Sequence, residues 1–592
     1  MSDFRAPLDD IGFALAAQAD LAGLARLPGF EAADEELVAA LLDEAGKLAG
    51  EVLAPTNRAG DAEGVALENG VVRLPTGFDT AYRAYVDGGW NGLSFDPDYG
   101  GQGLPWTIAL AVQEMFEAAN LAFSVGTLLT RGAVELLSHH GSAEQKSLYL
   151  PDMIAGTWSG TMNLTEPQAG TDLARIRTRA DRAGDGTYRI AGQKIFITYG
   201  EHELTENIVH LVLARLPDAP AGVKGISLFI VPKYLLKEDG RPGARNDLRC
   251  VSLERKLGIH GSPTCVMAYG DNGGATGFLV GEENHGLAYM FTMMNNARVA
   301  VGVQGLGIAE RAYQQALGYA RERVQGRRDG RDTTIVEHPD VRRMLLSMKA
   351  RIEAGRGLTY AAGAAYDRSR AHPDEKERAA AHLRFDLLTP VVKAWCTDNG
   401  VDIASLGVQI HGSMGFIEET GAAQHYRDAR ILPIYEGTNG IQALDLVGRK
   451  ILRDDGAAAA ALFDEMAATV EAASSAGLER YALRLTAGLE HLGRATDWLL
   501  QTAPGDNDLA SASATPYLAL LGTVAGGWQM TRQALAAQAG LKNGAGNRAF
   551  FEAKLAIARF FMDHEMPKAA ALATIVTDGA AAVAEAPDSL FG

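Results

Sequence analysis

The sequence predicts an α+β fold in which one β-rich region interrupts an otherwise helical chain. Three observations support this. Apolar residues recur at helical spacing over most of the 592 residues, short β-rich runs gather in one region, and the last part is alanine-rich without any strand-like run. The predicted domains are an N-terminal helical domain over 1–158, a β domain over 159–286, a helical bundle over 287–450 and a C-terminal helical extension over 451–592.

The N-terminal region is interpreted as helical from its periodicity. The segment DEELVAALLDEAGKLAGEVL carries apolar residues at positions i, i+3, i+4 and i+7, which is typical of an amphipathic helix. Ser142 and Gln145 have the spacing of a capping box, so another helix is expected to begin there. The Gly- and Pro-rich segment DPDYGGQGLP is interpreted as a turn.

The β region is recognised by its short, β-rich runs, which are broken by Gly, Pro, Asn and Asp. These runs are TYRIAGQKIFIT, IVHLVLARL, GISLFIVPKYLL and TCVMAYG. Their texture predicts a separate all-β module.

Helical periodicity returns after the β region. We expect one helix from about Leu287 to Val324, and then long helices separated by Pro339, Pro373 and Pro390. The extension beyond 451 carries ten Lys and Arg residues against sixteen Asp and Glu residues, a net charge of −6.

The overall charge excludes some partners. The chain has 55 Lys and Arg residues against 73 Asp and Glu residues, a formal net charge of −18. This acidic balance argues against a nucleic-acid surface and against an anionic membrane as partners.

The cysteines and the absence of targeting segments indicate the compartment. Only Cys250, Cys265 and Cys396 occur, without CxxC spacing, which suits a reducing compartment. Acids precede any apolar run at the N-terminus, so no signal peptide is expected. No uninterrupted apolar stretch is long enough to span a bilayer. The predicted location is cytoplasmic, with no membrane partner.

Several common motifs are missing from the sequence. There is no P-loop and no strand-linked GxGxxG, because GVQGLG at 302–307 lacks that spacing and falls inside a predicted helix. There is no HExxH, no Cys/His cluster and no GxSxG elbow, so no metal site is predicted. The common hydrolase and nicotinamide-dependent functions are therefore unsupported.

One glutamate stands in an unusual place. The segment ILPIYEGTNGIQ, from Ile431 to Gln442, puts Glu436 between an apolar run and a Gly-Thr-Asn-Gly turn, with apolar residues continuing at helical spacing. This pattern predicts a buried neighbourhood, in which a carboxylate would have a raised pKa and could act as a base. The alternative is a loop glutamate at a helix start, favoured by the helix dipole.

Five motifs occur in a fixed order along the chain. They are LTEPQAGTD at 164–172, KIFIT at 194–198, ERKLGIHGSPTC at 254–265, the segment from NNARVAVGVQG to VQGR at 295–327, and the segment from QIHGSMG to NGIQ at 409–442. With these motifs, residues of about 30–450 resemble the acyl-CoA dehydrogenase family. The two extensions resemble its large bacterial subfamily. The resemblance implies an N-terminal helical domain, a middle β-barrel domain, a helical bundle and an extra C-terminal helical domain.

The resemblance also implies a reaction. An acyl-CoA thioester is oxidised to a trans-2-enoyl-CoA, with Glu436 removing the α-proton and N5 of FAD accepting the β-hydride, because no side chain can accept a hydride. The family stabilises the thioester oxygen with the backbone N–H of the catalytic glutamate and a ribityl hydroxyl of the flavin. The subfamily favours a short acyl-CoA, with 3-methylmercaptopropionyl-CoA among the candidates.

Residues of the first two motifs match family positions that contact the flavin. They are Leu164, Thr165, Gly170, Thr171, Phe196 and Thr198. Thr171 also matches a substrate-binding position. Phe196 stands where the family usually has Trp, so an aromatic face is kept and an indole N–H is lost. Glu166 is interpreted as structural, because the family gives that position no part in proton transfer.

The later motifs imply contacts with substrate and with a partner subunit. Arg298 and Arg323 are 25 residues apart, about 37 Å on one helix, so they cannot hold the same phosphate. The resemblance places Arg298 on the CoA side and Arg323 at the FAD pyrophosphate of a neighbouring subunit; the alternative is two solvated arginines. Gln409 and Gly412 match positions that contact the partner's FAD, and Thr438 matches one beside the adenine or pyrophosphate.

Partners and alternatives follow from the same resemblance. A FAD shared across subunits implies that dimerisation is part of the active site. The C-terminal extension is expected to cover the surface that smaller family members use to pair dimers into tetramers, so a homodimer is predicted. Electron-transfer flavoprotein is the expected electron acceptor. An acyl-CoA oxidase, with O2 as acceptor, would use the same scaffold. A flavin-bearing nucleic-acid-binding protein of the alkylation-response type is a further alternative; it requires a basic C-terminal face, and the charge of −6 counts against it.

Overall fold

The computed structural model describes residues 4–502, 505–544 and 546–592. Contacts between residues divide the chain into two compact units. The first unit contains residues 45–104 and 119–297, and the second contains 6–44, 105–118 and 298–592. The predicted extension lies within the second unit, and so does the predicted helical bundle from residue 298 onward. The four domain boundaries drawn from the sequence stay predictions.

The first unit combines helices with an eight-stranded sheet. Its helices are α4 (Ala54–Glu63), α5 (Phe78–Asp87), α7 (Leu121–His140) and α8 (Ala143–Ala155), with the π-helix Leu48–Leu53 ahead of α4. Its larger strands are β3 (Trp158–Asn163), β4 (Arg179–Arg182), β5 (Tyr188–Thr198), β6 (Asn207–Ala214), β7 (Ser227–Pro232), β10 (Leu248–Leu253), β11 (Thr264–Tyr269) and β12 (Ala275–Leu279). These strands confirm the predicted β region, and α8 begins with the predicted capping box of Ser142 and Gln145.

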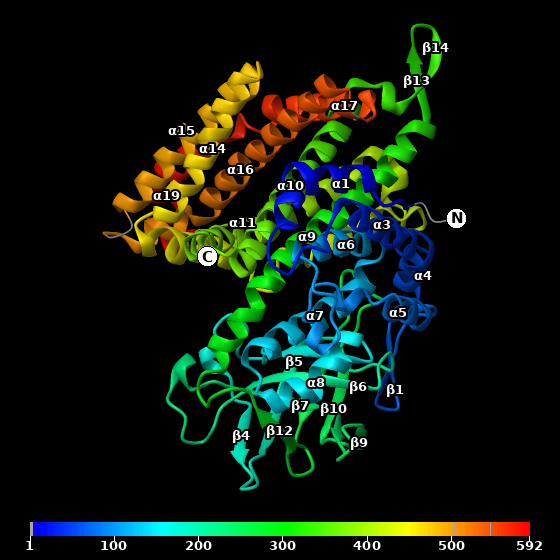
Figure 1. Cartoon of the computed structure of the whole chain (residues 1–592), viewed down its shortest axis with the longest axis vertical. Coiled ribbons are helices and arrows are strands. Elements are labelled where there is room, and N and C mark those ends of the chain that lie inside the picture. The colour runs from blue at the N-terminus through cyan, green and yellow to red at the C-terminus, as the bar shows by residue number, and fades with distance from the viewer. Residues whose placement is uncertain (1–3, 503–504, 545) are drawn as a thin grey trace. The chain divides into compact units, whose positions relative to one another are not determined.

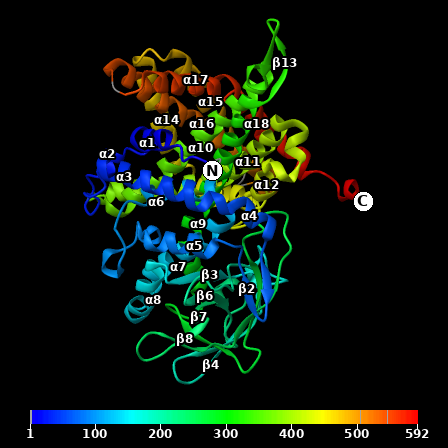
Figure 2. The same ribbon diagram turned by 90° about the vertical axis from the view of Figure 1, so that its right-hand side faces the viewer.

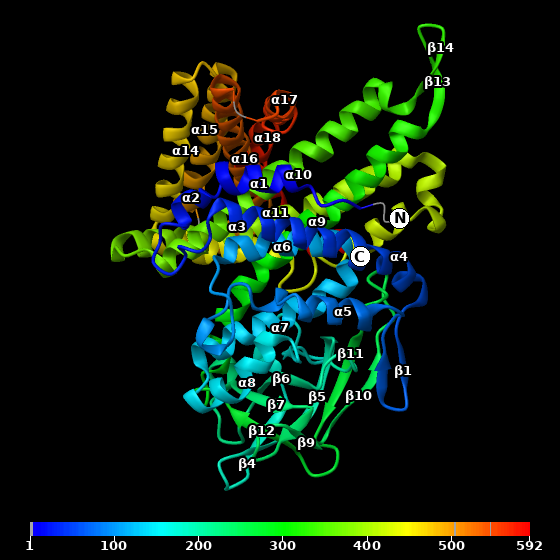
Figure 3. The ribbon, with the colours of Figure 1, turned by 45° about the vertical axis from the view of Figure 1, so that its right-hand side comes forward.

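The strand order in this sheet is β10-β11-β5-β12-β7-β6-β3, with β4 also paired to β5. Neighbouring strands are antiparallel except β3 and β6, which are parallel. Helices α7 and α8 lie against β3, as Figure 1 and Figure 3 show. Gly160 of β3 permits this packing, because a Cβ atom there would lie 2.5 Å from Cβ of Ala133 in α7.

Apolar side chains fill both faces of the sheet. Along β6, Val209, Leu211 and Leu213 join the core beneath α7 and α8. The intervening Val212 and Ala214 join a second core on the other face. Since successive side chains of a strand point to opposite faces, β6 is buried on both sides, which explains its unbroken apolar sequence.

One hairpin of this unit was not predicted. Strands β1 (Ala66–Glu68) and β2 (Val71–Arg73) form a hairpin inside the region predicted to be helical. The two turn residues, Asn69 and Gly70, have positive φ angles of 52° and 81°, and such a pair favours a tight hairpin turn. Strands β8 (Tyr234–Leu236) and β9 (Pro242–Arg245) form a second two-stranded sheet in this unit.

The second unit is almost entirely helical (Figure 2). Its core elements are α1 (Leu8–Ala17), α2 (Leu21–Leu24), α3 (Glu35–Lys47, entering the first unit), α6 (Trp106–Ala119), α9 (Gly286–Glu322, entering from the first unit), α10 (Pro339–Ala371), α11 (Glu375–His411), α12 (Ala422–Ala429) and α13 (Asn439–Asp445). The extension contains α14 (Ala457–Ser475), α15 (Glu479–Thr502), α16 (Asn507–Asn543), α17 (Arg548–His564), α18 (Lys568–Asp578) and α19 (Ala580–Ala584).

Helix α9 confirms the long helix expected from Leu287, but it ends at Glu322, so Arg323 lies just beyond it. The chain then forms a hairpin of β13 (Val324–Arg328) and β14 (Arg331–Thr334), which projects beyond the helices in Figure 1. Its turn residues Asp329 and Gly330 again have positive φ. The sequence interpretation of this stretch as purely helical was therefore wrong.

Two of the three prolines predicted to separate the helices of the bundle do so. Pro339 begins α10, and Pro373 lies between α10 and α11, as expected. Pro390 lies inside α11, where a separation was predicted. A proline in a helix interior loses one backbone hydrogen bond. Tertiary packing tolerates it here, since residues 387–397 of α11 are all buried.

The extension packs on the bundle through small residues. Gly522 and Gly526 of α16 face Trp395 of α11, and a Cβ atom at Gly522 would lie 2.5 Å from Cδ1 of that indole. Polar contacts reinforce this junction. Asp10 of α1 accepts from Lys554 of α17 at 2.7 Å, and it also pairs with Lys349 of α10. The N-terminal helix and the extension are therefore joined within one unit.

Two helices, Leu121–His140 and Asn507–Asn543, are long and apolar enough to cross a bilayer by length and composition. In each, 67% of the apolar window is buried by the surrounding chain. Core helices of soluble proteins pass the same test, so the observation is weak evidence for a membrane segment.

Candidate active site

Three groups of predicted site residues emerge, one in the first unit and two in the second. The first unit holds the loop of residues 164–171 and the end of β5. The second unit holds the turn of Pro433–Thr438, here called the Glu436 turn, and a cluster formed by Arg323, Gln409 and Gly412, here called the distal cluster.

A buried ion pair fixes the 164–171 loop to β5. Nζ of Lys194 lies 2.8 Å from a carboxylate oxygen of Glu166 and also donates to the carbonyl of Leu164 at 3.0 Å. The Glu166 carboxylate further accepts from Thr178 and from the backbone N–H of Arg177. Glu166 thus has a structural role: all its contacts are within the protein framework, and they hold Leu164 and Thr165 in place.

A β-bulge turns Phe196 out of the sheet. Opposite Cys265 and Met267, the β5 pairing steps from Ile197 to Lys194, so β5 carries one extra residue there. Phe196 has a φ angle of 62°, and its side chain is 58% exposed. Bulges re-aim side chains next to functional sites. The ring is therefore presented for contact with another molecule.

The polar groups around Phe196 fit a flavin. Within the described residues, the hydroxyl groups of Thr165 and Thr198 make no hydrogen bond. The N–H of Ile195 donates to the carbonyl of Thr165 at 2.9 Å, which brings the two threonine-bearing segments together. Gly170 and Thr171 are exposed, and a Cβ atom at Gly170 would meet no atom within 4 Å. Two free hydroxyls, an exposed ring and an open backbone suit the polar edge and the flat face of the isoalloxazine.

The Glu436 turn is held in a conformation that few residues adopt. Glu436 has a φ angle of 56°, in the left-handed region, where a non-glycine residue is strained. Nε2 of Gln442 donates to the carbonyls of Glu436 and Gly437, at 3.2 and 3.3 Å. Thr438 caps α13 by accepting from the N–H of Ile441. No described residue accepts a hydrogen bond from the backbone N–H of Glu436.

The environment of Glu436 favours its protonated form. Part of its side chain is exposed, but the surrounding protein still raises the pKa of its carboxyl through burial. The positive charges of Arg298 and Lys393 oppose this effect. The net result is a carboxyl whose pKa lies above its usual value of 4.5, as a base working near neutral pH requires.

Arg298 lies beside this turn. Its guanidinium is buried and forms an ion pair with Asp445 of α13 at 3.2 Å, and burial lowers its pKa. A Cβ atom at Gly437 would lie 3.9 Å from Nη2 of Arg298. Arg298 is therefore buried beside the turn, and its burial excludes the alternative of a solvated arginine. Its assignment to the CoA side of the substrate stays a prediction.

Lys393 of α11 was missed by sequence reasoning. It is fully buried, and its Nζ donates to the carbonyl of Leu432 at 2.9 Å and to Oδ1 of Asn439 at 2.8 Å. A signal was available, because Lys393 stands in the apolar run Pro390–Trp395 and a fully buried lysine is rare. The predicted site residues included no buried side chain beneath the turn.

The distal cluster lies at one end of the second unit. The rings of Tyr319 and His411 stack with centroids 4.5 Å apart, which joins the end of α9 to the end of α11. Arg323, Gln409 and Gly412 follow or precede these rings closely in sequence and are all exposed. Lys393 and Gln409 are separated by sixteen residues of α11, about 24 Å. Arg323 and Gln409 therefore come together, away from the Glu436 turn.

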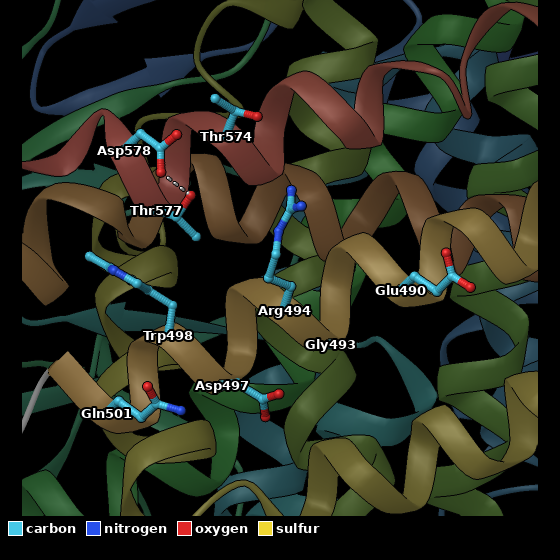
Figure 4. A pocket seen from close by; sticks show the side chains of 9 residues that line it. All are labelled: Glu490, Gly493, Arg494, Asp497, Trp498, Gln501, Thr574, Thr577 and Asp578. Atoms are coloured by element: carbon cyan, nitrogen blue, oxygen red, sulfur yellow. Dashed lines mark hydrogen bonds between the residues drawn. The ribbon is translucent and has the colours of Figure 1, made fainter.

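A separate hollow lies on the extension, between α15 and α18 (Figure 4). Its lining residues are Glu490, Gly493, Arg494, Asp497, Trp498, Gln501, Thr574, Thr577 and Asp578. Three of these residues are acidic and one is an arginine, and none of them is a predicted site residue. Nothing in its lining connects it with the chemistry of Glu436.

Comparison with known proteins identifies the family. Acyl-CoA dehydrogenase models for the N-terminal, middle and C-terminal domains match residues 36–157, 161–272 and 284–452, and an "acetyl-CoA dehydrogenase C-terminal like" model matches 462–587. A 3-methylmercaptopropionyl-CoA dehydrogenase of Ruegeria pomeroyi is 51% identical over 97% of this chain and 98% of its own length.

The chain belongs to the acyl-CoA dehydrogenase family.

Solved structures agree with this assignment. Caenorhabditis elegans ACDH-11, solved in complex with C11-CoA, matches 98% of this chain and 96% of its own with a TM-score of 0.77; at 19% identity this shows the shared fold. A chain solved in work on the electron transferring flavoprotein of Acidaminococcus fermentans is 26% identical, with a TM-score of 0.58, and covers 70% of this chain and 98% of its own. The predicted fold class and family are confirmed.

This acyl-CoA dehydrogenase is an oxidoreductase that acts on the CH–CH group of an acyl-CoA. Members of the family are FAD-dependent, and FAD is its cofactor. The free hydroxyls, the bulged Phe196 and the open backbone of the first unit fit that group.

Proposed function

We propose that Glu436 removes the α-proton of a short acyl-CoA thioester in this acyl-CoA dehydrogenase. The observation that carries the proposal is the Glu436 turn itself. It holds a carboxyl of raised pKa next to a backbone N–H that makes no hydrogen bond among the described residues. A base and an oxyanion donor on one residue suit proton removal next to a carbonyl.

The proton transfer can be written atom by atom. The Cα–H bond of the substrate breaks, its proton passes to the Glu436 carboxylate, and the electron pair moves towards the thioester carbonyl. The backbone N–H of Glu436 stabilises the charge that develops on the thioester oxygen. FAD, when bound, supplies the acceptor for the hydride that leaves the β-carbon.

The residues proposed to hold FAD form two sets. In the first unit, Thr165 and Thr198 serve the polar edge of the flavin, Phe196 contacts its ring, and Leu164, Gly170 and Thr171 line the same wall. In the second unit, Arg323, Gln409 and Gly412 serve the FAD of a partner subunit, and Thr438 serves the adenine or pyrophosphate. Arg298 and Thr171 are assigned to the acyl-CoA.

We propose a short acyl group as the substrate chain, with 3-methylmercaptopropionyl-CoA as the first candidate. The relative from Ruegeria pomeroyi bears that name and is similar over nearly the whole chain, including both extensions. Anaerobic titration of the purified holoenzyme with an acyl-CoA series tests this. The flavin absorbance should bleach most rapidly with 3-methylmercaptopropionyl-CoA or another short chain. Bleaching only by long or aromatic acyl-CoAs would contradict the substrate assignment while keeping the reaction.

We also propose a homodimer. Met414, Phe416 and Ile417, here called the apolar patch, directly follow Gly412 of the distal cluster. Phe416 is 86% exposed. A cluster of exposed apolar side chains beside residues assigned to a partner's FAD is typical of a subunit interface.

Electron-transfer flavoprotein is the proposed electron acceptor. The likeness to a chain solved in work on the electron transferring flavoprotein of Acidaminococcus fermentans supports it. Reoxidation of the reduced enzyme should be much faster with an electron-transfer flavoprotein than with O2; the reverse order would indicate an acyl-CoA oxidase. The acidic extension does not favour the nucleic-acid-binding alternative. A cytoplasmic location is proposed, supported by three free cysteines.

A further inference from the structure

We infer that Lys393 is a positioning residue that clamps both ends of the Glu436 turn and thereby sets the orientation of the catalytic carboxyl. The inference rests on the proposed role of Glu436 as the base. It concerns a buried residue of α11 that is not among the residues proposed to bind FAD or substrate.

The clamp is visible in the hydrogen bonds. Lys393 donates to the carbonyl of Leu432, immediately before the turn, and to Oδ1 of Asn439, immediately after it. The N–H of Asn439 in turn donates to the carbonyl of Pro433 at 2.9 Å, which closes the turn on itself. One ammonium group thus ties the entrance and the exit of the turn to α11.

Asn439 extends the attachment to α11. Its Nδ2 donates to Oδ1 of Asp398 at 2.7 Å, to Oγ1 of Thr397 at 3.0 Å and to the carbonyl of Ala394 at 3.2 Å. Because the amide nitrogen is committed to these acceptors, its oxygen points at Lys393. The side chain of Asn439 therefore has one orientation only.

The turn needs such an attachment. A left-handed backbone at a non-glycine residue is strained and persists only when its surroundings impose it. Gln442 holds the carbonyls of Glu436 and Gly437 from α13. The hydroxyl of Tyr435 donates to Gln304 of α9, which attaches the residue before Glu436. Lys393 adds an attachment to α11 at both ends of the turn.

Lys393 also acts on the charge of the carboxyl. The charged groups facing Glu436 are Arg298 from α9 and Lys393 from α11, while Asp445 faces Arg298 and Asp398 faces Lys393. Burial lowers the pKa of Lys393 to about 7, and the nearby Glu436 partly offsets this. Removing the positive charge of Lys393 would raise the pKa of Glu436 further.

Two substitutions separate the clamp from the charge. Lys393→Met keeps the apolar stem and removes both hydrogen bonds and the charge, whereas Lys393→Gln removes the charge but keeps an N–H donor. Thr389→Val is the matched control, because Thr389 is buried on the same helix and bonds only within it. Circular dichroism and bound-FAD content establish that each variant is folded and loaded.

The first readout is the rate of anaerobic flavin reduction at saturating acyl-CoA. In Lys393→Met the rate of flavin reduction should fall about 100-fold, because a small misplacement of a catalytic group can cost that much. KM should change by less than about 3-fold. Lys393→Gln should lose less, and Thr389→Val should keep the wild-type rate. A rate of Lys393→Met within about 3-fold of wild type, or a loss matched by Thr389→Val, would overturn the inference.

The second readout does not depend on turnover. The carboxyl stretch of protonated Glu436, identified by its loss in Glu436→Gln, can be followed by infrared spectroscopy against pH in the substrate-free enzyme. Its midpoint should move to higher pH in both Lys393 variants and stay in place in Thr389→Val. An unmoved midpoint would refute the electrostatic part.

Asn439→Ala tests the same inference independently, and it remains informative if Lys393→Met fails to fold. It removes the acceptor of Lys393 after the turn, so it should slow flavin reduction on its own. The double variant Lys393→Met/Asn439→Ala should reduce its flavin at a rate within about 3-fold of the slower single variant. The effects should not add, because both substitutions remove the same hydrogen bond. A full-rate Asn439→Ala enzyme would contradict the clamp. An inactive wild type would instead refute the proposed function.

Discussion

The stacked rings of Tyr319 and His411, 4.5 Å apart, join the end of α9 to the end of α11. This contact brings together Arg323 and Gln409, which are 86 residues apart in the sequence. Gln409 is about 24 Å along α11 from Lys393, which bonds to both ends of the Glu436 turn. One helical unit thus carries two sites. The division agrees with a flavin shared between subunits, in which the distal cluster serves the partner.

The apolar patch should control dimerisation. Phe416→Asp places a charge on a side chain that is 86% exposed in the single chain, so the fold should persist while the interface is lost. Light scattering should show a monomer, or a dimer weakened by about 100-fold. Bound FAD should fall in parallel, because the partner's distal cluster is withdrawn.

Leu483→Asp is the control for this prediction. Leu483 is 70% exposed on α15, in the extension. Its variant should remain a dimer with full FAD content. A Phe416→Asp protein that stays a stable dimer would show that the interface lies elsewhere.

Arg323 should contribute to FAD affinity. Its side chain is exposed and forms no ion pair within the described parts of the chain, so it is available to a phosphate. Hydrogen bonds to charged groups contribute about 1.5–3 kcal/mol, so Arg323→Gln should raise the Kd for FAD about 10- to 100-fold. Reconstitution of apoenzyme followed by fluorescence measures this. Arg484→Gln, on α15, should bind FAD normally; equal affinities in both variants would exclude the assigned role.

Glu436→Gln should stop the reaction at proton removal. The amide keeps the size of the carboxyl but cannot accept the α-proton, so flavin reduction should slow at least about 1000-fold. Bound FAD and acyl-CoA affinity should be close to wild type. Stopped-flow absorbance measures the rate, with Glu377→Gln, an exposed position on α11, as the control. A Glu436→Gln enzyme that bleaches at a normal rate would place the base on another residue.

The pair of Glu166 and Lys194 should stabilise the first unit. Glu166→Gln leaves a buried ammonium without its partner, so the free energy of unfolding should fall by about 3 kcal/mol near pH 7. Burial opposes the charged form of Glu166, but Lys194 and the hydrogen bonds from Thr178 and Arg177 outweigh it, and its pKa falls to about 2.

The pH dependence of this pair has a definite sign. A carboxyl with a depressed folded pKa adds stability above its unfolded value of 4.5, and loses it as the pH falls towards 2. The difference in stability between wild type and Glu166→Gln should therefore shrink between pH 5 and pH 2. Urea denaturation across this range measures it. A constant difference would show that the ion pair is not its source.

Most of the fold could be predicted because its signals are local. In the strands of the β region and in the helix from Gly286 to Glu322, the residue pattern that indicates a strand or a helix is visible within a short stretch of sequence. The hairpins at Asn69-Gly70 and Asp329-Gly330 were missed, because each lies in a short stretch between long helical patterns. Pro390 was misjudged because the packing that tolerates a proline inside a helix is supplied by other helices.

The site could be predicted in part for the same reason. Glu436, Thr165, Thr198 and Arg323 stand in contiguous motifs and could be read directly. The apolar run around Lys393 indicated a buried lysine, but its partners Leu432 and Asn439 are 39 and 46 residues away and nothing in α11 indicates them. The ion pair of Arg298 with Asp445 spans 147 residues and was equally hidden.

The sequence by itself determined the order of the helical and β regions, the family and the identity of the proposed base. These depend on periodicity and on short motifs, which are properties of neighbouring residues. Only the tertiary structure decided the left-handed conformation of Glu436, the bulge that exposes Phe196, and the burial and neighbouring charges that together determine the pKa of the proposed base. Those depend on residues brought together from distant parts of the chain, because burial and Coulomb interactions act through space.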